Sequence, residues 1–203
     1  MDSDHTRRLP HIYPRGKALF FTWHLHGCLP SSMAPPPGEL TSGQAFAWMD
    51  RHLDTLRTGP LYLRQRAIAE IIVRSIRKGE GLGHYDLHAY VVMANHVHLL
   101  IQPKVSPSHL MKSLKGATAR EANKALKRTG EPFWQKESYD HWVRDEAEFR
   151  SIRAYIENNP VKAGLVNAPT EFLWSSAGVE TSLSLDAART SACATSFGLL
   201  YWK

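Results

Sequence analysis

Residues 85–103 have the sequence YDLHAYVVMANHVHLLIQP, which contains the strongest structural signal in the chain. Two runs rich in β-branched and aromatic residues flank Met93-Ala94-Asn95, a pattern that predicts an antiparallel hairpin with a tight turn. Side chains alternate across a strand, so His96 and His98 share one face of the second strand. The opposite face then carries the aliphatic side chains Val97, Leu99 and Ile101.

On both sides of this hairpin, the hydrophobic periodicity predicts further helices and strands. We expect a strand over 18–29, a helical region over 44–78 with a break at Gly59-Pro60, a helix from Ser106 to about Gly130, a short strand plus loop over 133–143, and a last helix from Asp145 to the Asn159-Pro160 break. This order predicts an α+β fold of the ferredoxin-like, split βαβ type. We expect an antiparallel sheet with helices on one face and a functional site on the other.

Composition restricts the class of protein. The chain has 203 residues, 43% of them hydrophobic, which suits one folded domain and excludes disorder over its whole length. No stretch approaches the roughly 18–20 apolar residues of a spanning helix, so we expect no membrane partner. The polar start does not resemble a signal peptide, and two cysteines give no disulfide framework, so a cytoplasmic location is expected. We expect a domain over 1–177, with an N-terminal arm (1–16), and a C-terminal tail over 178–203.

The charge balance points to a polyanionic partner. Lysine and arginine number 25 against 19 acids, a net charge of +6. Several basic residues fall on the helix after the hairpin and on the turn that follows it, and they are candidate phosphate contacts: Lys112, Lys115, Arg120, Lys124, Lys127 and Arg128. Arg7 and Arg8 in the arm are weaker candidates. The alternative is an ordinary solvated helix face.

Two further patterns suggest chemistry. Imidazoles at His96 and His98 could bind one divalent ion, although two histidines can also alternate on a strand by chance, as His24 and His26 show. Tyr155 and Asn159 are four residues apart and share a helix face. The alternative for this second pair is a tyrosine that packs on the sheet, followed by an ordinary Asn-Pro helix stop.

Taken together, these motifs resemble the REP-associated tyrosine transposases, a branch of the single-tyrosine HUH transposases. HUH denotes two histidines around a hydrophobic residue, here His96-Val97-His98, and the second motif is YIENNPVKAGLV over 155–166. Three further segments are also similar to this family: GKALFFTWHLHGCLP (16–30), FWQKESYDHWVRDEAEF (133–149) and LWSSA (173–177). The likeness covers about residues 7–178.

The resemblance implies DNA transposition, by cleavage and rejoining of single-stranded hairpin DNA from repetitive palindromes. Tyr155 would be the nucleophile and form a 5′-phosphotyrosine. His96 and His98, with Asn159 at a position where relatives commonly have glutamine, would hold Mg²⁺ or Mn²⁺. Tyr139 is the rival nucleophile.

The alternatives are a domesticated DNA-binding protein without turnover and a metal-dependent nuclease that uses water. The protein would act as a monomer or a homodimer.

Overall fold

The computed structural model describes residues 13–29, 42–56 and 58–178. The elements are, in chain order, β1 (Leu19–His24), α1 (Ser42–Thr55), the short 3-10 helix η1 (Tyr62–Arg64), α2 (Arg66–Gly81), β2 (Tyr85–Val92), β3 (His96–Pro103), α3 (Pro107–Ala125), β4 (Tyr139–Trp142), α4 (Glu146–Lys162) and the 3-10 helix η2 (Pro169–Glu171). Residues 1–12 of the expected arm and 179–203 of the expected tail lie outside the described ranges. The division into domain, arm and tail stays a prediction.

The four strands form one antiparallel sheet in the order β2-β3-β1-β4. The expected hairpin is present, with its turn at Met93-Ala94-Asn95 between β2 and β3. β1 lies between β3 and β4, and its Thr22 pairs with His98 in register. The split βαβ arrangement is therefore confirmed, and it brings β1 beside the strand that carries both histidines.

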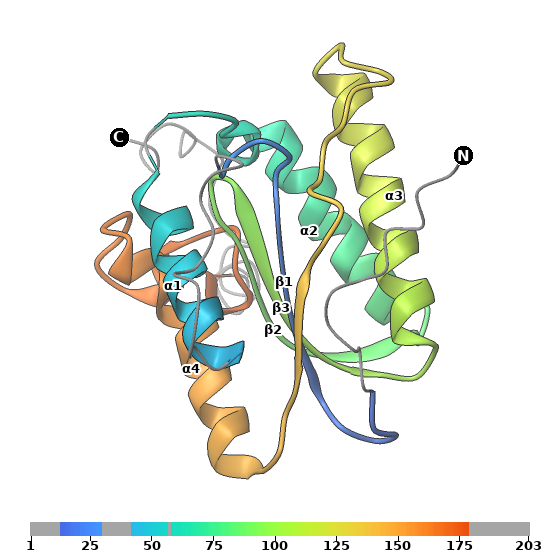
Figure 1. Cartoon of the computed structure of the whole chain (residues 1–203), viewed down its shortest axis with the longest axis vertical. Coiled ribbons are helices and arrows are strands. Elements are labelled where there is room, and N and C mark those ends of the chain that lie inside the picture. Colours follow the sequence, from blue (N-terminus) through green and yellow to red (C-terminus); the bar gives the residue numbers. More distant parts are fainter. Residues whose placement is uncertain (1–12, 30–41, 57, 179–203) are drawn as a thin grey trace, which may run out of the picture.

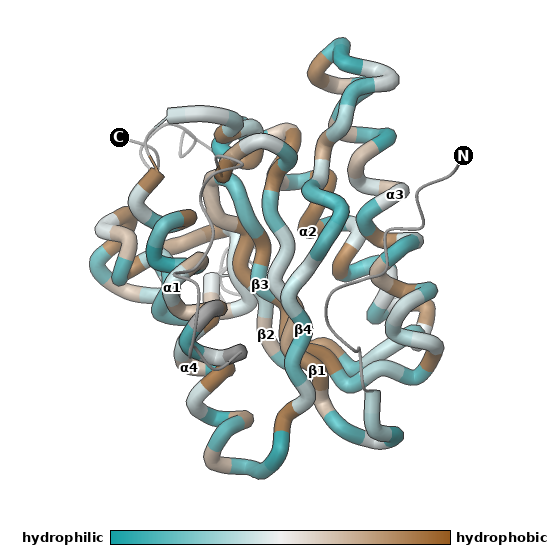
Figure 2. The backbone as a smooth tube through the Cα atoms, viewed as in Figure 1, coloured by the Kyte–Doolittle hydropathy of each residue, from teal (hydrophilic) through white to brown (hydrophobic). Residues whose placement is uncertain are grey.

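One face of the sheet is covered by α2 and α3 (Figure 1). Alternate residues of β1 and β3 supply its buried apolar side chains, with the isoleucines of α2 packed on them: Leu19, Phe21, Trp23, Val97, Leu99, Ile101, Ile68, Ile72 and Ile76. Figure 2 shows hydrophobic and hydrophilic residues alternating along α3, as expected for a helix with one buried side. This is the larger of the two cores.

The second face is not open, so the expectation of helices on one face only was wrong. α1 and α4 lie on the other side of the sheet from α2 and α3 (Figure 1). Phe20, Val91 and Leu100 form a second apolar cluster there, packed against Phe46 of α1 and Ile156 of α4. Both faces of the sheet carry apolar side chains, so both must be covered by helices. His96 and His98 are therefore buried between the sheet and the layer formed by α1 and α4.

Two helix boundaries refine the sequence expectations. The helical region over 44–78 is interrupted at Gly59-Pro60 as predicted, and η1 lies between α1 and α2. α4 does not stop at Asn159-Pro160: it continues through Pro160 to Lys162. Pro160 lies close to the end of the helix, and after it the Ala163 N–H still donates to the Asn159 carbonyl at 3.0 Å. Within the described part of the chain, no helix combines the length and apolar character that crossing a membrane requires.

Candidate metal centre and nucleophile

Strand β3 presents two fully buried imidazoles, His96 and His98, on the face covered by α1 and α4. Each ring is held by its Nδ1 atom: that of His96 donates to Oδ1 of Asn95 at 2.7 Å, and that of His98 is 2.7 Å from Oγ1 of Thr22. The Nε2 atoms are thereby left to face a common point. Fixing the second ring nitrogen in this way is typical of histidines that bind metals.

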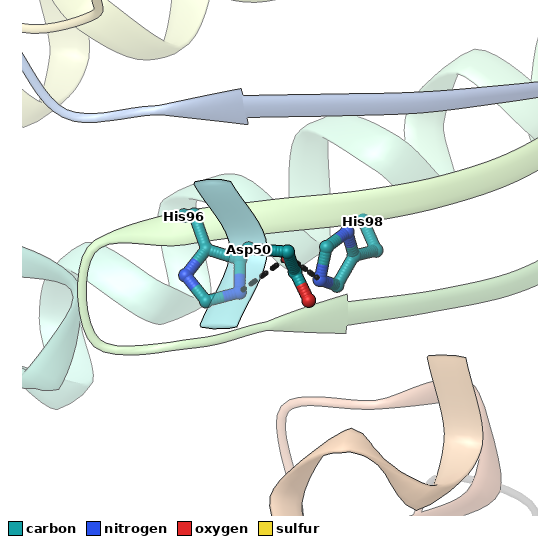
Figure 3. A group of neighbouring side chains, drawn as sticks. All are labelled: Asp50, His96 and His98. Carbon is teal, nitrogen blue, oxygen red and sulfur yellow. Dashed lines mark ion pairs between the residues drawn. The ribbon is translucent and has the colours of Figure 1, made fainter. Parts of the chain in front are cut away.

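Asp50 of α1 completes this group, and the sequence analysis missed it. Figure 3 shows its carboxylate between the two rings. Its Oδ1 atom lies 3.2 Å from Nε2 of His98 and 3.9 Å from Nε2 of His96. A signal was present in the sequence, because Asp50 and Asp54 are four residues apart and share a face of a helix that must bury one side.

The donor set fits a divalent cation. One atom each from Asp50, His96 and His98 lie within 4.8 Å of one another. Four buried atoms at this place lack a hydrogen-bond partner among the described residues: Oδ1 of Asp50, Oδ1 of Asp54, Nε2 of His96 and Oδ1 of Asn159. Buried polar atoms normally have a partner, so this concentration of unpaired acceptors marks a place for a positive ion. Imidazole nitrogens and carboxylate or amide oxygens are all ligands that divalent metal ions take in proteins.

The protonation states agree with a ligand set. Burial, reinforced by the neighbouring His98, lowers the pKa of His96 to about 3, so this imidazole is neutral at physiological pH. Burial alone would raise the pKa of Asp50, but His98 and His96 outweigh it and hold that pKa below its usual value. Burial and the charge of Asp50 raise the pKa of Asp54 to about 7. The site therefore holds a neutral imidazole, an ionised carboxylate and a second carboxyl group whose pKa is raised.

Tyr155 reaches the same place from α4. Its hydroxyl donates a hydrogen bond to Oδ2 of Asp50, the oxygen that does not face His98. Its half-buried ring lies 5.4 Å from the ring of His98 and 6.2 Å from that of Phe20. Nζ of Lys162 lies 4.8 Å from the ring centroid on the outer side. One carboxylate thus links the tyrosine to the two histidines.

Asn159, one helical turn after Tyr155, is fully buried beside His98. Its Nδ2 atom is 3.4 Å from Nε2 of His98, and its Oδ1 atom has no partner among the described residues. The two ends of an amide exchange by a simple flip, which would turn the oxygen toward the histidines. The structure therefore brings together Tyr155, His96, His98 and Asn159, as the sequence motifs suggested.

Tyr139 lies at the rim of this site, on the edge strand β4. Its ring stacks on Phe46 with a centroid separation of 4.3 Å, and it meets Phe20 edge-on at 6.2 Å. Both partners also contact the ring of Tyr155. Tyr139 is thus connected to Tyr155 through the rings of Phe46 and Phe20.

The basic residues of α3 and of the turn after it are not part of this site. Lys112, Arg120, Lys124 and Lys127 are exposed, on the layer that covers the opposite face of the sheet. Two other candidates have internal partners. Nζ of Lys115 donates to the carbonyls of Gln135 and Lys136 at 2.9 and 3.0 Å, and the Arg128 guanidinium lies 4.5 Å from the Tyr62 ring centroid. Arg7 and Arg8 lie outside the described residues.

Comparison with solved structures supports the fold. A structure of a REP-associated tyrosine transposase bound to a REP hairpin matches with a TM-score of 0.51 at 17% sequence identity, covering 98% of each chain. A crystal structure of a provisionally assigned transposase from Deinococcus radiodurans R1 matches with a TM-score of 0.42 at 19% identity, covering 75% of this chain and 98% of that one. The first likeness agrees with the expected HUH transposase fold. No curated protein gives a significant match.

The family comparison is more specific. Residues 63–159 match the family model for IS200-like transposases. This segment contains His96, His98, Tyr155 and Asn159, the four residues that meet on one face of the sheet, whereas Asp50 precedes it. Over this segment, which is slightly under half of the chain, the sequence is similar to the IS200-like transposases.

Proposed function

We propose that this protein cleaves and rejoins single-stranded hairpin DNA through a 5′-phosphotyrosine on Tyr155, as a member of the REP-associated branch. The observation that carries the proposal is the shared carboxylate of Asp50, which places a tyrosine hydroxyl beside a cation-binding group. A tyrosine that only packed on the sheet would not need its hydroxyl buried against an ionised carboxylate.

His96, His98 and Asp50 would hold the ion, with Asn159 as a fourth ligand. Mg²⁺ or Mn²⁺, when bound there, would polarise the scissile phosphate and offset the charge that develops on it. The four side chains come from β3, α1 and α4, so the ligand set forms only when the sheet and both helices are packed. Their burial removes competing water and strengthens each of these interactions.

The Tyr155–Asp50 contact suggests how the tyrosine is activated for attack. A free phenol has a pKa of about 10 and is mostly protonated at neutral pH, so it needs a base. Oδ2 of Asp50 accepts the phenolic proton while the Tyr155 oxygen bonds to phosphorus. The bond from phosphorus to the 3′ oxygen breaks, and that oxygen takes the proton from Asp50. Because one phosphodiester has been exchanged for another, the same steps in reverse rejoin a strand.

DNA binding would use a second surface. The solved relative is described as bound to a REP hairpin, which supports hairpin DNA as the partner here. The exposed cations of α3 (Lys112, Arg120 and Lys124) and of the turn after it (Lys127) are the proposed phosphate contacts. Lys115 and Arg128, given their internal contacts, would instead support the shape of that surface. A DNA substrate would place the protein in the cytoplasm.

The test is an adduct assay. The wild-type protein is incubated with end-labelled hairpin oligonucleotides and Mn²⁺, denatured, and analysed by gel electrophoresis and peptide mapping. A labelled protein band with DNA on Tyr155 is expected. Cleavage without an adduct would indicate a nuclease that uses water, and binding without cleavage would indicate a domesticated DNA-binding protein. Sedimentation of the complex would separate monomer from homodimer.

A further inference from the structure

A cavity of about 240 Å³ adjoins the ligand set on the side of His96. It lies between the end of α1, the β2–β3 turn and the segment after α4. Its wall surface is nearly half polar. Apolar or small residues (Leu53, Leu56, Leu61, Met93, Ala94, Ala163, Gly164 and Leu165) line it together with Asp54, Arg64, Asn95 and His96. A hollow that combines apolar walls with fixed polar groups is the usual form of a ligand pocket.

We propose that this cavity holds one unstacked nucleobase, from a nucleotide next to the phosphate that is cleaved. The inference rests on the proposed function and names part of its substrate. His96 belongs both to the ligand set and to the cavity wall, so a strand whose phosphate is held at the ion has a neighbouring base within reach of the cavity. Single-stranded bases are commonly bound singly, unstacked, against apolar or aromatic side chains.

The size of the cavity supports a single base. Pockets for larger organic ligands have volumes of about 300–1,000 Å³, and this cavity falls just below that range. A larger hollow of about 550 Å³ lies between α2 and α3, but it is on the opposite face of the sheet from Tyr155. Of these two cavities, the smaller one shares a residue with the ligand set, so a base beside the scissile phosphate can enter it.

Asp54 gives the cavity a chemical preference. Its Oδ1 atom is buried and has no hydrogen-bond partner among the described residues, although Nε2 of His96 lies 3.6 Å away. A carboxylate oxygen accepts hydrogen bonds, and adenine, cytosine and guanine each carry an exocyclic amino donor. Thymine has no amino group, and its one ring donor is the N3–H. The cavity therefore favours a base whose exocyclic amino group reaches Asp54.

The experiment measures binding rather than cleavage. Hairpin oligonucleotides with randomised single-stranded flanks are bound to the wild-type protein in EDTA, recovered and sequenced. We expect one flank position at which thymine is depleted about tenfold, since one lost hydrogen bond to a buried acceptor has about that effect. An abasic nucleotide at this position of the selected hairpin should weaken binding about tenfold or more, and abasic nucleotides at the next flank positions should not.

Three variants test the location. Ala94→Trp and Ala163→Trp each place an indole in the cavity and should remove both the base preference and the abasic effect at that one position. Ala117→Trp, on the wall of the hollow between α2 and α3, is the matched control and should leave both unchanged. Asp54→Asn should admit thymine, because an amide also offers a donor. Circular dichroism checks that each variant folds.

The outcomes are distinct. No position-specific abasic effect in the wild type, or an effect unchanged in both tryptophan variants that fold, would overturn the cavity assignment. A change in Mn²⁺ affinity in Asp54→Asn, with thymine still excluded, would overturn the role given to Asp54. The proposed function fails separately, if the selected hairpin gives no phosphotyrosine adduct with the wild type in Mn²⁺.

Discussion

The hydroxyl of Tyr155 donates a hydrogen bond to one carboxylate oxygen of Asp50, and the other oxygen of Asp50 lies 3.2 Å from Nε2 of His98. A single side chain from α1 therefore sets how far the Tyr155 hydroxyl stands from the two histidines. β3 carries the histidines and α4 carries Tyr155, so neither element alone could set this distance.

Replacing Tyr155 by phenylalanine should abolish both cleavage and the covalent adduct. Phenylalanine keeps the ring that packs against Phe20 and His98 and removes only the attacking oxygen. Folding, metal binding and hairpin binding should therefore be retained. A labelled hairpin with Mn²⁺ and a denaturing gel measure the adduct, and calorimetry measures metal binding.

Tyr139→Phe is the matched control for this variant. Tyr139 belongs to the same aromatic cluster through Phe46, so its loss perturbs the packing near the site in a comparable way. We expect the adduct to persist, at a reduced rate at most. An adduct that disappears in Tyr139→Phe and survives in Tyr155→Phe would reverse the assignment of the nucleophile.

His96→Ala and His98→Ala should each remove strand cleavage while leaving hairpin binding largely intact. Both imidazoles face the point where an ion would bind, whereas the proposed phosphate contacts lie on the other face of the sheet. Titration calorimetry with Mn²⁺ should show a loss of affinity in both variants. His109→Ala, on the exposed surface of α3, is the control. Cleavage at the wild-type rate by either variant would contradict the ligand assignment.

Asp50→Asn should slow adduct formation by about 10²–10⁴-fold, the usual contribution of a positioned general base. The amide keeps the shape of the side chain but neither accepts the Tyr155 proton readily nor carries a charge toward an ion, so Mn²⁺ affinity should also fall. Asp86→Asn, which removes an exposed acid paired with Lys104 at 2.5 Å, should change neither quantity. An unchanged single-turnover rate in Asp50→Asn would remove Asp50 from the mechanism.

Asp54→Asn should stabilise the metal-free protein at pH 8. Burial, followed by the charge of Asp50, raises the pKa of Asp54 from 3.8 to about 7, so above pH 7 the folded state must bury a charge that the unfolded state exposes to water. Each pH unit between the two pKa values is worth about 1.4 kcal/mol, which gives a gain of roughly 4 kcal/mol at most.

The pH dependence of this gain tests its cause. As the pH falls from 7 toward 4, the folded wild type binds a proton that the unfolded chain does not, so the advantage of the variant should shrink and vanish near pH 4. Urea unfolding at pH 8, 6 and 4 measures the free energy of unfolding. A constant difference between the two proteins would mean that ionisation of Asp54 is not its origin.

The exposed cations of α3 and of the turn after it should account for the salt dependence of binding. Replacing Lys112, Arg120, Lys124 and Lys127 by alanine should weaken binding to matched and scrambled hairpins alike. It should also reduce the slope of log affinity against log salt by about one unit for each lost phosphate contact. Arg150→Ala, an exposed residue of α4, is the control. An unchanged slope in the quadruple variant would place the DNA-binding surface elsewhere.

Local sequence patterns predicted the parts of the site that lie on one element or on neighbouring ones. The period of two placed His96 and His98 on one face of β3, and the four-residue spacing placed Tyr155 and Asn159 on one side of α4. Asp50 could not be assigned in this way, because its role depends on how α1 packs on a strand more than forty residues further along the chain. The second layer of helices was missed for the same reason.

The placement of these groups on opposite sides of the sheet also limits the geometry of the DNA. If the stem of a hairpin rests on the outer side of α3, its strand must pass around the sheet before it meets Tyr155. One helix layer alone is about 10–12 Å thick, which corresponds to about three nucleotides at duplex spacing. Tyr155 then cannot reach a phosphate directly at the base of the stem. The length of the unpaired spacer determines which phosphate is cleaved.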